Sequence, residues 1–385
     1  MIRPFTYTGA KKIVFGTGSF RGLADHIREL GGGRPMIVLD HTLAEAGFRK
    51  TVKDLLDKSG LSYSLFDGVE PEPALERADE GAKAAVKGKC DLVVGIGGGS
   101  AMDVAKAVAA LAGNKGKAVD YLGLNKVPGP GLPTIMVPTT AGTGSEVTFT
   151  AVFVRKNLKK KEGMNSPYLY PEVALLDPEL TLSLPAQATA STGIDALCHA
   201  IESYTSINAS PMSEAISLEA VGLIVENLRT CVHNGGDLEA RERMLLGSLY
   251  AGLGLANAGV TAVHSLSYPL GGAWGIPHGM ANTLMLPAVM AYNLPGAIDK
   301  FAVLAEVMGQ EVEGISMRDA ATLALDAVEL LIEDCGLAMT LEEFGIAEKD
   351  LPALADVALT VARPLANNPR KITREDAIDI YRDAL

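Results

Sequence analysis

The chain has 385 residues, of which 48% are hydrophobic, and it exceeds the roughly 250–300 residues that one core usually supports, so two domains are expected. Its net charge of −12 disfavours nucleic acid as a partner, because binding to phosphates requires clustered lysine and arginine. Neither the roughly 18–20 apolar residues of a membrane span nor a CxxC cysteine pair occurs, so we expect no membrane partner and a reducing, cytoplasmic location.

Short apolar runs alternate with helical patterns in the first half of the chain. The runs predict buried strands at residues 36–40, 91–96, 133–138 and 173–177. The helical patterns between them include residues 74–87 and 101–111. Continuous apolar strands that alternate with helices are typical of an α/β domain with a parallel sheet covered on both faces.

Strand patterns disappear after about residue 185, and long segments of helical periodicity follow. These segments predict helices at residues 193–205, 213–228, 238–255 and 319–333. We therefore predict an α/β domain over residues 1–184 and an all-helical domain over residues 185–385.

A glycine-rich turn, Gly95-Ile96-Gly97-Gly98-Gly99-Ser100, follows the second predicted strand and opens a helix. Glycines allow backbone N–H groups to close on an anion, and the helix N-terminus adds partial positive charge. A pyrophosphate site is the favoured interpretation. The alternative is a tight strand-to-helix turn in which Ser100 caps the helix.

A second turn and an acidic residue extend this pattern. Thr139, Thr140 and Thr143 follow the third predicted strand, and their hydroxyls suit ribose and phosphate oxygens, although a polar loop is an equal alternative for this turn alone. Two such turns on one sheet favour a dinucleotide. Asp40 ends the first predicted strand, where it either binds a ribose and disfavours the 2′-phosphate of NADP, or caps a helix.

Candidate metal ligands occur in the helical half. Asp195 and His199 are four residues apart and leave the same helix face, and both are suitable ligands for Fe(II), Zn(II) or Mn(II). A simple surface contact is the alternative for this pair. His264 and His278 lie in apolar, glycine-rich segments, where a buried imidazole needs a partner such as a metal; a satisfied core histidine is the alternative for each.

Taken together, the motifs GGGSAMDVAK, PTTAGTGSEVT and GIDALCHAIESY, with the segments around His264 and His278, resemble the iron-containing alcohol dehydrogenase family over nearly the whole chain. That family includes lactaldehyde reductases, 1,3-propanediol dehydrogenases and butanol dehydrogenases. The resemblance implies a Rossmann-like dinucleotide-binding domain, a helical metal-binding and substrate domain (a dehydroquinate synthase-like architecture), and NAD-dependent oxidation of small primary alcohols or reduction of aldehydes.

The resemblance also implies a ligand set and a metal. Asp195, His199, His264 and His278 would hold one divalent ion. Four protein ligands already complete tetrahedral zinc, whereas Fe(II) readily takes five or six, so iron is favoured and Zn(II) is the alternative. The family's NAD contacts map onto Gly97, Gly98, Gly99, Ser100, Asp103, Thr139, Thr140, Thr143 and, less securely, Lys161. A homodimer or larger homo-oligomer is expected, with residues 5–8 as an edge strand that pairs across a two-fold axis.

The chain departs from the family pattern at Tyr268, where many members carry a histidine four residues after the third ligand. Because the pKa of a phenol is about 10 and that of an imidazole is about 6.5, we hypothesise that Tyr268 shapes the substrate pocket or joins a slower proton relay. A packing tyrosine is the alternative. Tyr268 and His278 are thus the candidate catalytic residues, and the expected pocket, with Trp274, Phe149 and Asn257, is mostly apolar.

Three other functions stay open at this point. A hydroxyacid dehydrogenase of the 4-hydroxybutyrate type and a maleylacetate-reductase-like enzyme share the fold. A non-catalytic nucleotide- or metal-binding scaffold is the alternative from a different class of protein. Such a degenerate copy is expected to have lost a ligand or a turn glycine, and none is missing.

Overall fold

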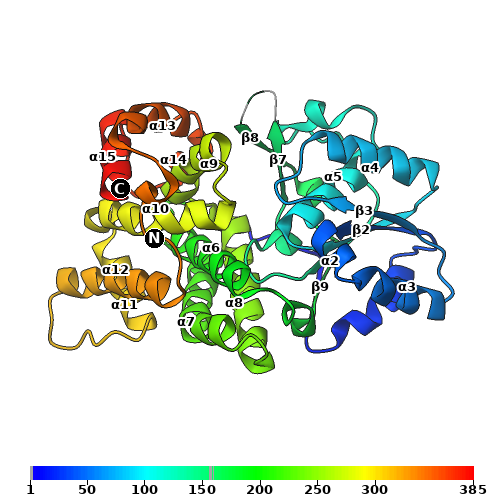
Figure 1. Cartoon of the computed structure of the whole chain (residues 1–385), viewed down its shortest axis with the longest axis horizontal. Helices are drawn as coiled ribbons and strands as arrows, with labels where there is room; N and C mark the ends of the chain where they lie inside the picture. Colours follow the sequence, from blue (N-terminus) through cyan, green and yellow to red (C-terminus); the bar gives the residue numbers. More distant parts are fainter. Residues whose placement is uncertain (1–2, 156–157, 159) are drawn as a thin grey trace. The chain divides into compact units, whose positions relative to one another are not determined.

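The computed structural model describes residues 3–155, 158 and 160–385, and these divide into two compact units (Figure 1). The α/β unit comprises residues 9–140 and 144–181. The helical unit comprises residues 182–385, the short segment 141–143 and the chain up to Thr8. The domain boundary at residues 184–185 stays a prediction, since compact units need not be independently folding domains.

Within the described residues, the main sheet of the α/β unit has six parallel strands in the order β1-β9-β6-β4-β2-β3. Their bounds are β1 (Lys12–Phe15), β2 (Pro35–Asp40), β3 (Ser64–Val69), β4 (Leu92–Gly97), β6 (Thr134–Pro138) and β9 (Val173–Leu176). Gly97 of β4 pairs with Pro138 of β6, and Leu39 of β2 pairs with Ile96 of β4. The chain therefore leaves β2, β4 and β6 at one edge of the sheet, where Asp40 and both predicted turns begin.

Two apolar cores cover the two faces of this sheet. Alternate residues of each strand enter opposite cores: Val38 and Val93 pack on one face, and Ile37 and Val94 on the other. Helices α4 (Glu76–Lys87) and α5 (Gly99–Gly113) contribute to the first core, and α1 (Leu23–Glu29), α2 (His41–Glu45) and α3 (Phe48–Lys58) to the second. The predicted α/β class with both sheet faces covered is confirmed.

A second, smaller sheet was not predicted. In the part of the chain that the structure describes, β5 (Gly123–Leu124), β8 (Lys160–Asn165) and β7 (Thr150–Arg155) lie side by side in that order, with β7 and β8 antiparallel. The sequence of β8, Lys-Lys-Glu-Gly-Met-Asn, lacks the alternation of apolar and polar residues that identifies a half-buried strand.

The helical unit follows the predicted periodicity. Each of the four predicted helices lies inside a longer observed helix, in α6, α7, α8 or α12. The bounds are α6 (Ala186–Thr205), α7 (Pro211–His233), α8 (Leu238–Ala258), α9 (Ala262–Trp274), α10 (His278–Asn293), α11 (Ile298–Val307), α12 (Met317–Asp334), α13 (Leu351–Ala358), α14 (Ala362–Asn367) and α15 (Arg374–Asp383). Across the described chain, no single helix has the length and apolar composition to cross a membrane, and α8 and α9 pass that test only as a pair bent by 103°.

Residues 5–8, which were expected as an edge strand, have no regular secondary structure. Instead, the Thr8 amide donates to Asn257 Oδ1 (2.7 Å), and Asn257 Nδ2 donates to the Thr8 carbonyl (2.9 Å). Asn257 thus holds the N-terminal segment on α8. Pairing across a two-fold axis stays a prediction.

Candidate metal and cofactor sites

Three helices of the helical unit carry the predicted metal ligands. Asp195 and His199 lie one turn apart on α6, and both are buried. His264 lies in the first turn of α9 and is also buried, and His278 is the first residue of α10. The positive end of a helix dipole favours a neutral imidazole at both of these helix starts.

The three histidine side chains all approach the carboxylate of Asp195. The Nε2 atoms of His199, His264 and His278 lie 3.8, 3.9 and 3.8 Å from Asp195 Oδ1, respectively. The Nε2 atoms of His199 and His264 are 3.1 Å apart. The structure therefore brings together Asp195, His199 and His264, whose donor atoms all lie within 4.8 Å of one another. The fourth predicted ligand, His278, has its Nε2 3.8 Å from Asp195 Oδ1 and lies beside this group.

Hydrogen bonding at the far side of two rings fixes their tautomers. His199 Nδ1 lies 3.3 Å from the Gly142 carbonyl, and His264 Nδ1 bonds to the carboxylate of Glu202. Both partners only accept, so both Nδ1 atoms carry a proton and, in the neutral rings, both Nε2 atoms present lone pairs. Burial lowers the pKa of His199 against the opposing charge of Asp195, which disfavours a second proton there. The lone pairs of two Nε2 atoms 3.1 Å apart repel each other, and a cation bound between them would remove this repulsion. The donor atoms of this group therefore fit a divalent metal.

Asn282, one turn after His278 on α10, meets the same centre. Its Nδ2 lies 2.6 Å from Asp195 Oδ1, 3.2 Å from His264 Nε2 and 3.3 Å from His278 Nε2. Burial raises the pKa of Asp195, whereas the hydrogen bond from this amide and any positive charge on the three histidines lower that pKa, and the net shift is downward. The hydrogen bond that Asn282 donates to Asp195 Oδ1 favours the ionised carboxylate, which is the form that binds a metal.

The first glycine turn contains two glycines with different physical demands. Gly97 has φ +145°, and a Cβ there would lie 2.7 Å from the Cβ of Asp40, so the fold itself requires glycine. A Cβ at Gly98 would meet the Thr140 side chain at 3.5 Å, an ordinary contact. Packing among the described residues therefore does not explain glycine at position 98, whereas close approach of a ligand would.

The start of α5 has no side-chain cap. Gly98 is the N-cap residue, so the alternative interpretation of Ser100 as the cap is wrong. Ser100 instead accepts a hydrogen bond from the Glu72 amide (3.2 Å). Gly99 and Ser100 open the helix, and their amides are among those that a helix N-terminus leaves without an intrahelical partner, which suits an anion.

The second turn is joined to the first. The Thr139 amide donates to the Gly97 carbonyl (3.0 Å). The Thr140 hydroxyl is buried and has no hydrogen-bond partner among the described residues, which suits a ligand at Gly98. Thr143 belongs to the segment counted with the helical unit.

Asp103 is engaged within the protein. It accepts hydrogen bonds from Ser145 Oγ (2.6 Å) and the Val152 amide (2.8 Å), and it pairs with buried Lys106 (3.3 Å). These contacts hold the second turn and β7 against α5. They indicate a structural role for Asp103, and its direct contact with a cofactor stays a prediction.

Two other predicted cofactor residues also have partners in the chain. Asp40 caps α2 by accepting from the amides of Thr42 (2.9 Å) and Leu43 (3.3 Å), as its alternative interpretation stated. The Lys161 side chain is 7% exposed and pairs with Glu72 (2.7 Å), the residue whose amide donates to Ser100 Oγ.

Tyr268 lies beside the metal histidines, with its ring centre 5.9 Å from that of His278 and 6.5 Å from that of His264. Trp274 is the last residue of α9. Phe149 packs on Tyr170 in the α/β unit, with ring centres 5.4 Å apart. Of the expected pocket residues, Tyr268 is therefore the one that the structure places in ring contact with the predicted metal ligands His264 and His278.

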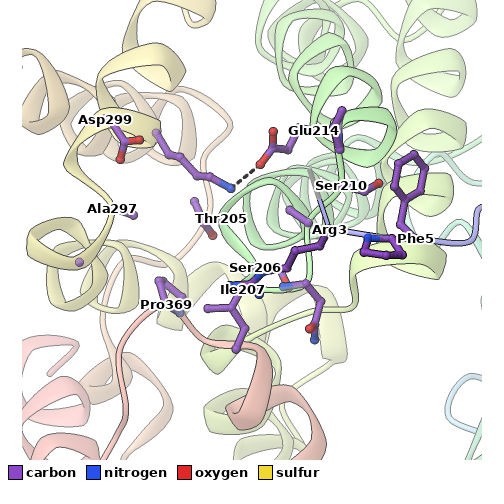
Figure 2. Close-up of a pocket in the computed structure, with 16 residues that line it drawn as sticks. Arg3, Phe5, Thr205, Ser206, Ile207, Ser210, Glu214, Ala297, Asp299 and Pro369 are labelled. Carbon is purple, nitrogen blue, oxygen red and sulfur yellow. Dashed lines mark hydrogen bonds and ion pairs between the residues drawn. The ribbon is translucent and has the colours of Figure 1, made fainter. Parts of the chain in front are cut away.

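A separate hollow of about 700 Å³ lies in the helical unit, at the N-terminus of α7 (Figure 2). Arg3, Phe5 and Ser210 line it, and the ion pair between Lys300 and Glu214 (2.7 Å) crosses its wall. None of the four predicted metal ligands lines this hollow.

The sequence analysis missed Glu202 and Asn282. Glu202 lies three residues after His199, and Asn282 lies four residues after His278, so helical spacing places each on or near the face of a predicted ligand. That spacing was the available signal. Their contacts with a ligand from another helix depend on the packing of α6, α9 and α10.

Comparison with known proteins agrees with this fold and defines the chain as an oxidoreductase. Residues 10–178 match the family model "Iron-containing alcohol dehydrogenase", and residues 189–385 match "Fe-containing alcohol dehydrogenase family, C-terminal". The chain belongs to the iron-containing alcohol dehydrogenase family.

Individual relatives cover the whole chain. Long-chain-alcohol dehydrogenase 1 of Geobacillus thermodenitrificans (strain NG80-2) is 40% identical over 372 residues, which span 96% of this chain and 94% of the relative. NAD-dependent methanol dehydrogenase of Bacillus methanolicus is 37% identical over 97% of both chains. A solved structure of 1,3-propanediol oxidoreductase has a TM-score of 0.96 at 36% identity and covers 100% of both chains.

Proposed function

We propose that this protein is an NAD-dependent, iron-containing alcohol dehydrogenase that interconverts small primary alcohols and aldehydes. The observation that carries the proposal is the convergence of Asp195, His199, His264 and His278, with two imidazole lone pairs facing each other at 3.1 Å. Together with family membership, this arrangement supports a divalent cation at the centre, and with four protein ligands it supports Fe(II) over Zn(II).

When bound, such a cation supplies Lewis acidity, which lowers the pKa of an alcohol and polarises an aldehyde carbonyl. The protein's own part is to hold four donor atoms in place and to keep them unprotonated. Asp195 is buried, and the charge of its carboxylate would offset part of the cation's charge. The His278 side chain is 31% exposed, whereas those of His199 and His264 are 5% and 4% exposed, so we assign the substrate side of the centre to His278.

Three features of the α/β unit support NAD as the hydride carrier. Gly98 has no side chain to obstruct a ligand that approaches its backbone, and the start of α5 has no side-chain cap. The Thr140 hydroxyl is buried with no hydrogen-bond partner in the described chain. A pyrophosphate at this turn would use all three. Asp40, at the end of the neighbouring strand, supports NAD over NADP, because a carboxylate close to the ribose would repel the 2′-phosphate of NADP.

Tyr268 is the proposed determinant of substrate fit beside the metal. Its ring stands next to His278, and residues 262–280 of this region contain no lysine or arginine. A neutral substrate therefore fits better than a hydroxyacid or another anion. The named relatives include a methanol and a long-chain-alcohol dehydrogenase, so family membership alone leaves the length of the alcohol open.

The test is a reconstitution of activity. Metal-stripped protein is resupplied separately with Fe(II), Zn(II) and Mn(II), and NADH formation and consumption are followed with short alcohols, diols, hydroxyacids and aldehydes. We expect Fe(II) to restore turnover of a primary alcohol in the wild type and not in His264→Ala. No turnover of any substrate with any metal, despite NADH binding, would contradict the proposal.

A further inference from the structure

Glu202 on α6 is buried, with 2% of its surface exposed, and its carboxylate is surrounded by donors. Oε1 accepts from the Thr261 amide (3.0 Å), the Thr261 hydroxyl (2.8 Å) and the Val263 amide (2.8 Å). Oε2 bonds to His264 Nδ1. A single side chain thus holds both the start of α9 and the ring of the histidine in its first turn.

We propose that Glu202 is a positioning residue that sets both the location and the tautomer of His264, so that Nε2 faces the metal as a lone pair. This inference rests on the proposed metal site. A ligand histidine whose second ring nitrogen donates to a carboxylate has a fixed orientation and a more basic ligand nitrogen. Buried Glu202 can do this because its other oxygen is fully satisfied by the start of α9.

The role requires a carboxylate. Glutamine has one acceptor oxygen and one NH₂ donor, whereas the amides of Thr261 and Val263 and the Nδ1 of His264 all donate to position 202, as does the Thr261 hydroxyl. If the glutamine oxygen faces Thr261 and Val263, its NH₂ faces His264 Nδ1. The ring then has to accept at Nδ1 and carry its proton on Nε2, which removes the lone pair that would bind the metal.

The tautomer of His199 does not depend on a carboxylate in this way. Its Nδ1 faces the backbone carbonyl of Gly142, which is an acceptor whatever the side chains are. His264 is therefore the one of these two ligands whose tautomer depends on another side chain. The tautomer change caused by Glu202→Gln should therefore be confined to His264.

The test measures Zn(II) affinity of the full-length, metal-stripped protein by competition with a chromophoric chelator. Glu202→Gln should bind Zn(II) about 10–100-fold more weakly than the wild type. Glu214→Gln is the matched control, because it makes the same chemical change in an ion pair with Lys300 elsewhere in the helical unit. Wild-type affinity in a folded Glu202→Gln protein would overturn the inference.

A second measurement uses the wild type and does not depend on the folding of the variant. Nitrogen-15 NMR of histidine-labelled, metal-free protein reports which ring nitrogen carries the proton, and His264→Ala identifies the signal of His264. We expect a protonated Nδ1 and a bare Nε2. A proton on Nε2 of neutral His264 in the wild type would overturn the inference.

The same experiments separate this inference from the proposed function. If His264→Ala binds Zn(II) as tightly as the wild type, the metal site itself is wrong. If His264→Ala loses Zn(II) and Glu202→Gln does not, the metal site stands and the positioning role of Glu202 is refuted.

Discussion

Glu146 provides a pH-dependent test of the α/β unit. Its side chain lies in the short 3₁₀ helix η3 (Ser145–Val147) of the second turn and is 1% exposed, and its Oε1 has no hydrogen-bond partner among the described residues. Burial raises the pKa of this carboxyl from 4.5 to about 7, against the opposing effects of its own backbone amide and of Lys106. The substitution Glu146→Gln removes the ionisation and keeps the shape.

The sign of the effect follows from proton binding. Between pH 4.5, the ordinary pKa, and about pH 7, the folded carboxyl keeps a proton that the unfolded chain has released. The free energy of unfolding therefore falls as pH rises, by about 1.4 kcal/mol per pH unit and by about 3 kcal/mol over the window. The loss of unfolding free energy is complete above the folded-state pKa of about 7 and absent below the unfolded-state pKa of 4.5.

The assay compares wild type and Glu146→Gln by urea unfolding, followed by circular dichroism. The variant should gain about 2–3 kcal/mol relative to the wild type between about pH 5 and about pH 8. Glu70→Gln, which changes an exposed residue of the same unit, should show no such pH-dependent gain. A difference between Glu146→Gln and wild type that is the same at both pH values would refute the reasoning.

Three further predictions concern the cofactor and substrate residues. Gly98→Ala should keep the wild-type Tm and weaken NADH binding, measured by fluorescence titration. Gly97→Ala should lower the Tm, because its Cβ would lie 2.7 Å from that of Asp40. Equal NADH affinity in wild type and Gly98→Ala would argue against a pyrophosphate at Gly98. Asp40→Asn should keep the cap of α2 and raise kcat/KM with NADP relative to NAD. Asp40→Ala should do the same and, because it also removes the cap, lower the free energy of unfolding by about 1 kcal/mol. An unchanged cofactor preference in both variants would contradict the role assigned to Asp40. Tyr268→Phe should lower kcat and alter the pH–rate profile if the phenol relays a proton, and an unchanged profile with a changed KM would leave Tyr268 with substrate fit alone.

Much of the fold was predictable because its central elements have strong patterns. Strands β2, β4 and β6 are buried on both faces and read as continuous apolar runs, and α6 to α8 have clear helical periodicity. The small sheet escaped prediction because β8 is polar and β5 has two residues. Such strands are defined by their partners and not by their own composition.

The residues of the candidate metal site were predictable from the sequence, whereas the hydrogen bonds that hold them were not. Asp195, His199, His264 and His278 were selected by chemistry, spacing and family resemblance, and the structure brings them together. Asp103 bonds to Ser145, and Lys161 pairs with Glu72. No local sequence pattern predicts either contact. The partners that hold His264 and Asp195, Glu202 and Asn282, likewise depend on helix packing.

The most direct test of the central claim measures metal and turnover together. Metal-stripped protein is dialysed anaerobically against Fe(II), and bound iron and NADH formation from a primary alcohol are measured on the same sample, for the wild type, Asp195→Asn and His264→Ala. We predict stoichiometric iron and alcohol-dependent NADH formation in the wild type, with both lost in the two variants. Undiminished iron binding or undiminished turnover in folded variants would contradict the account.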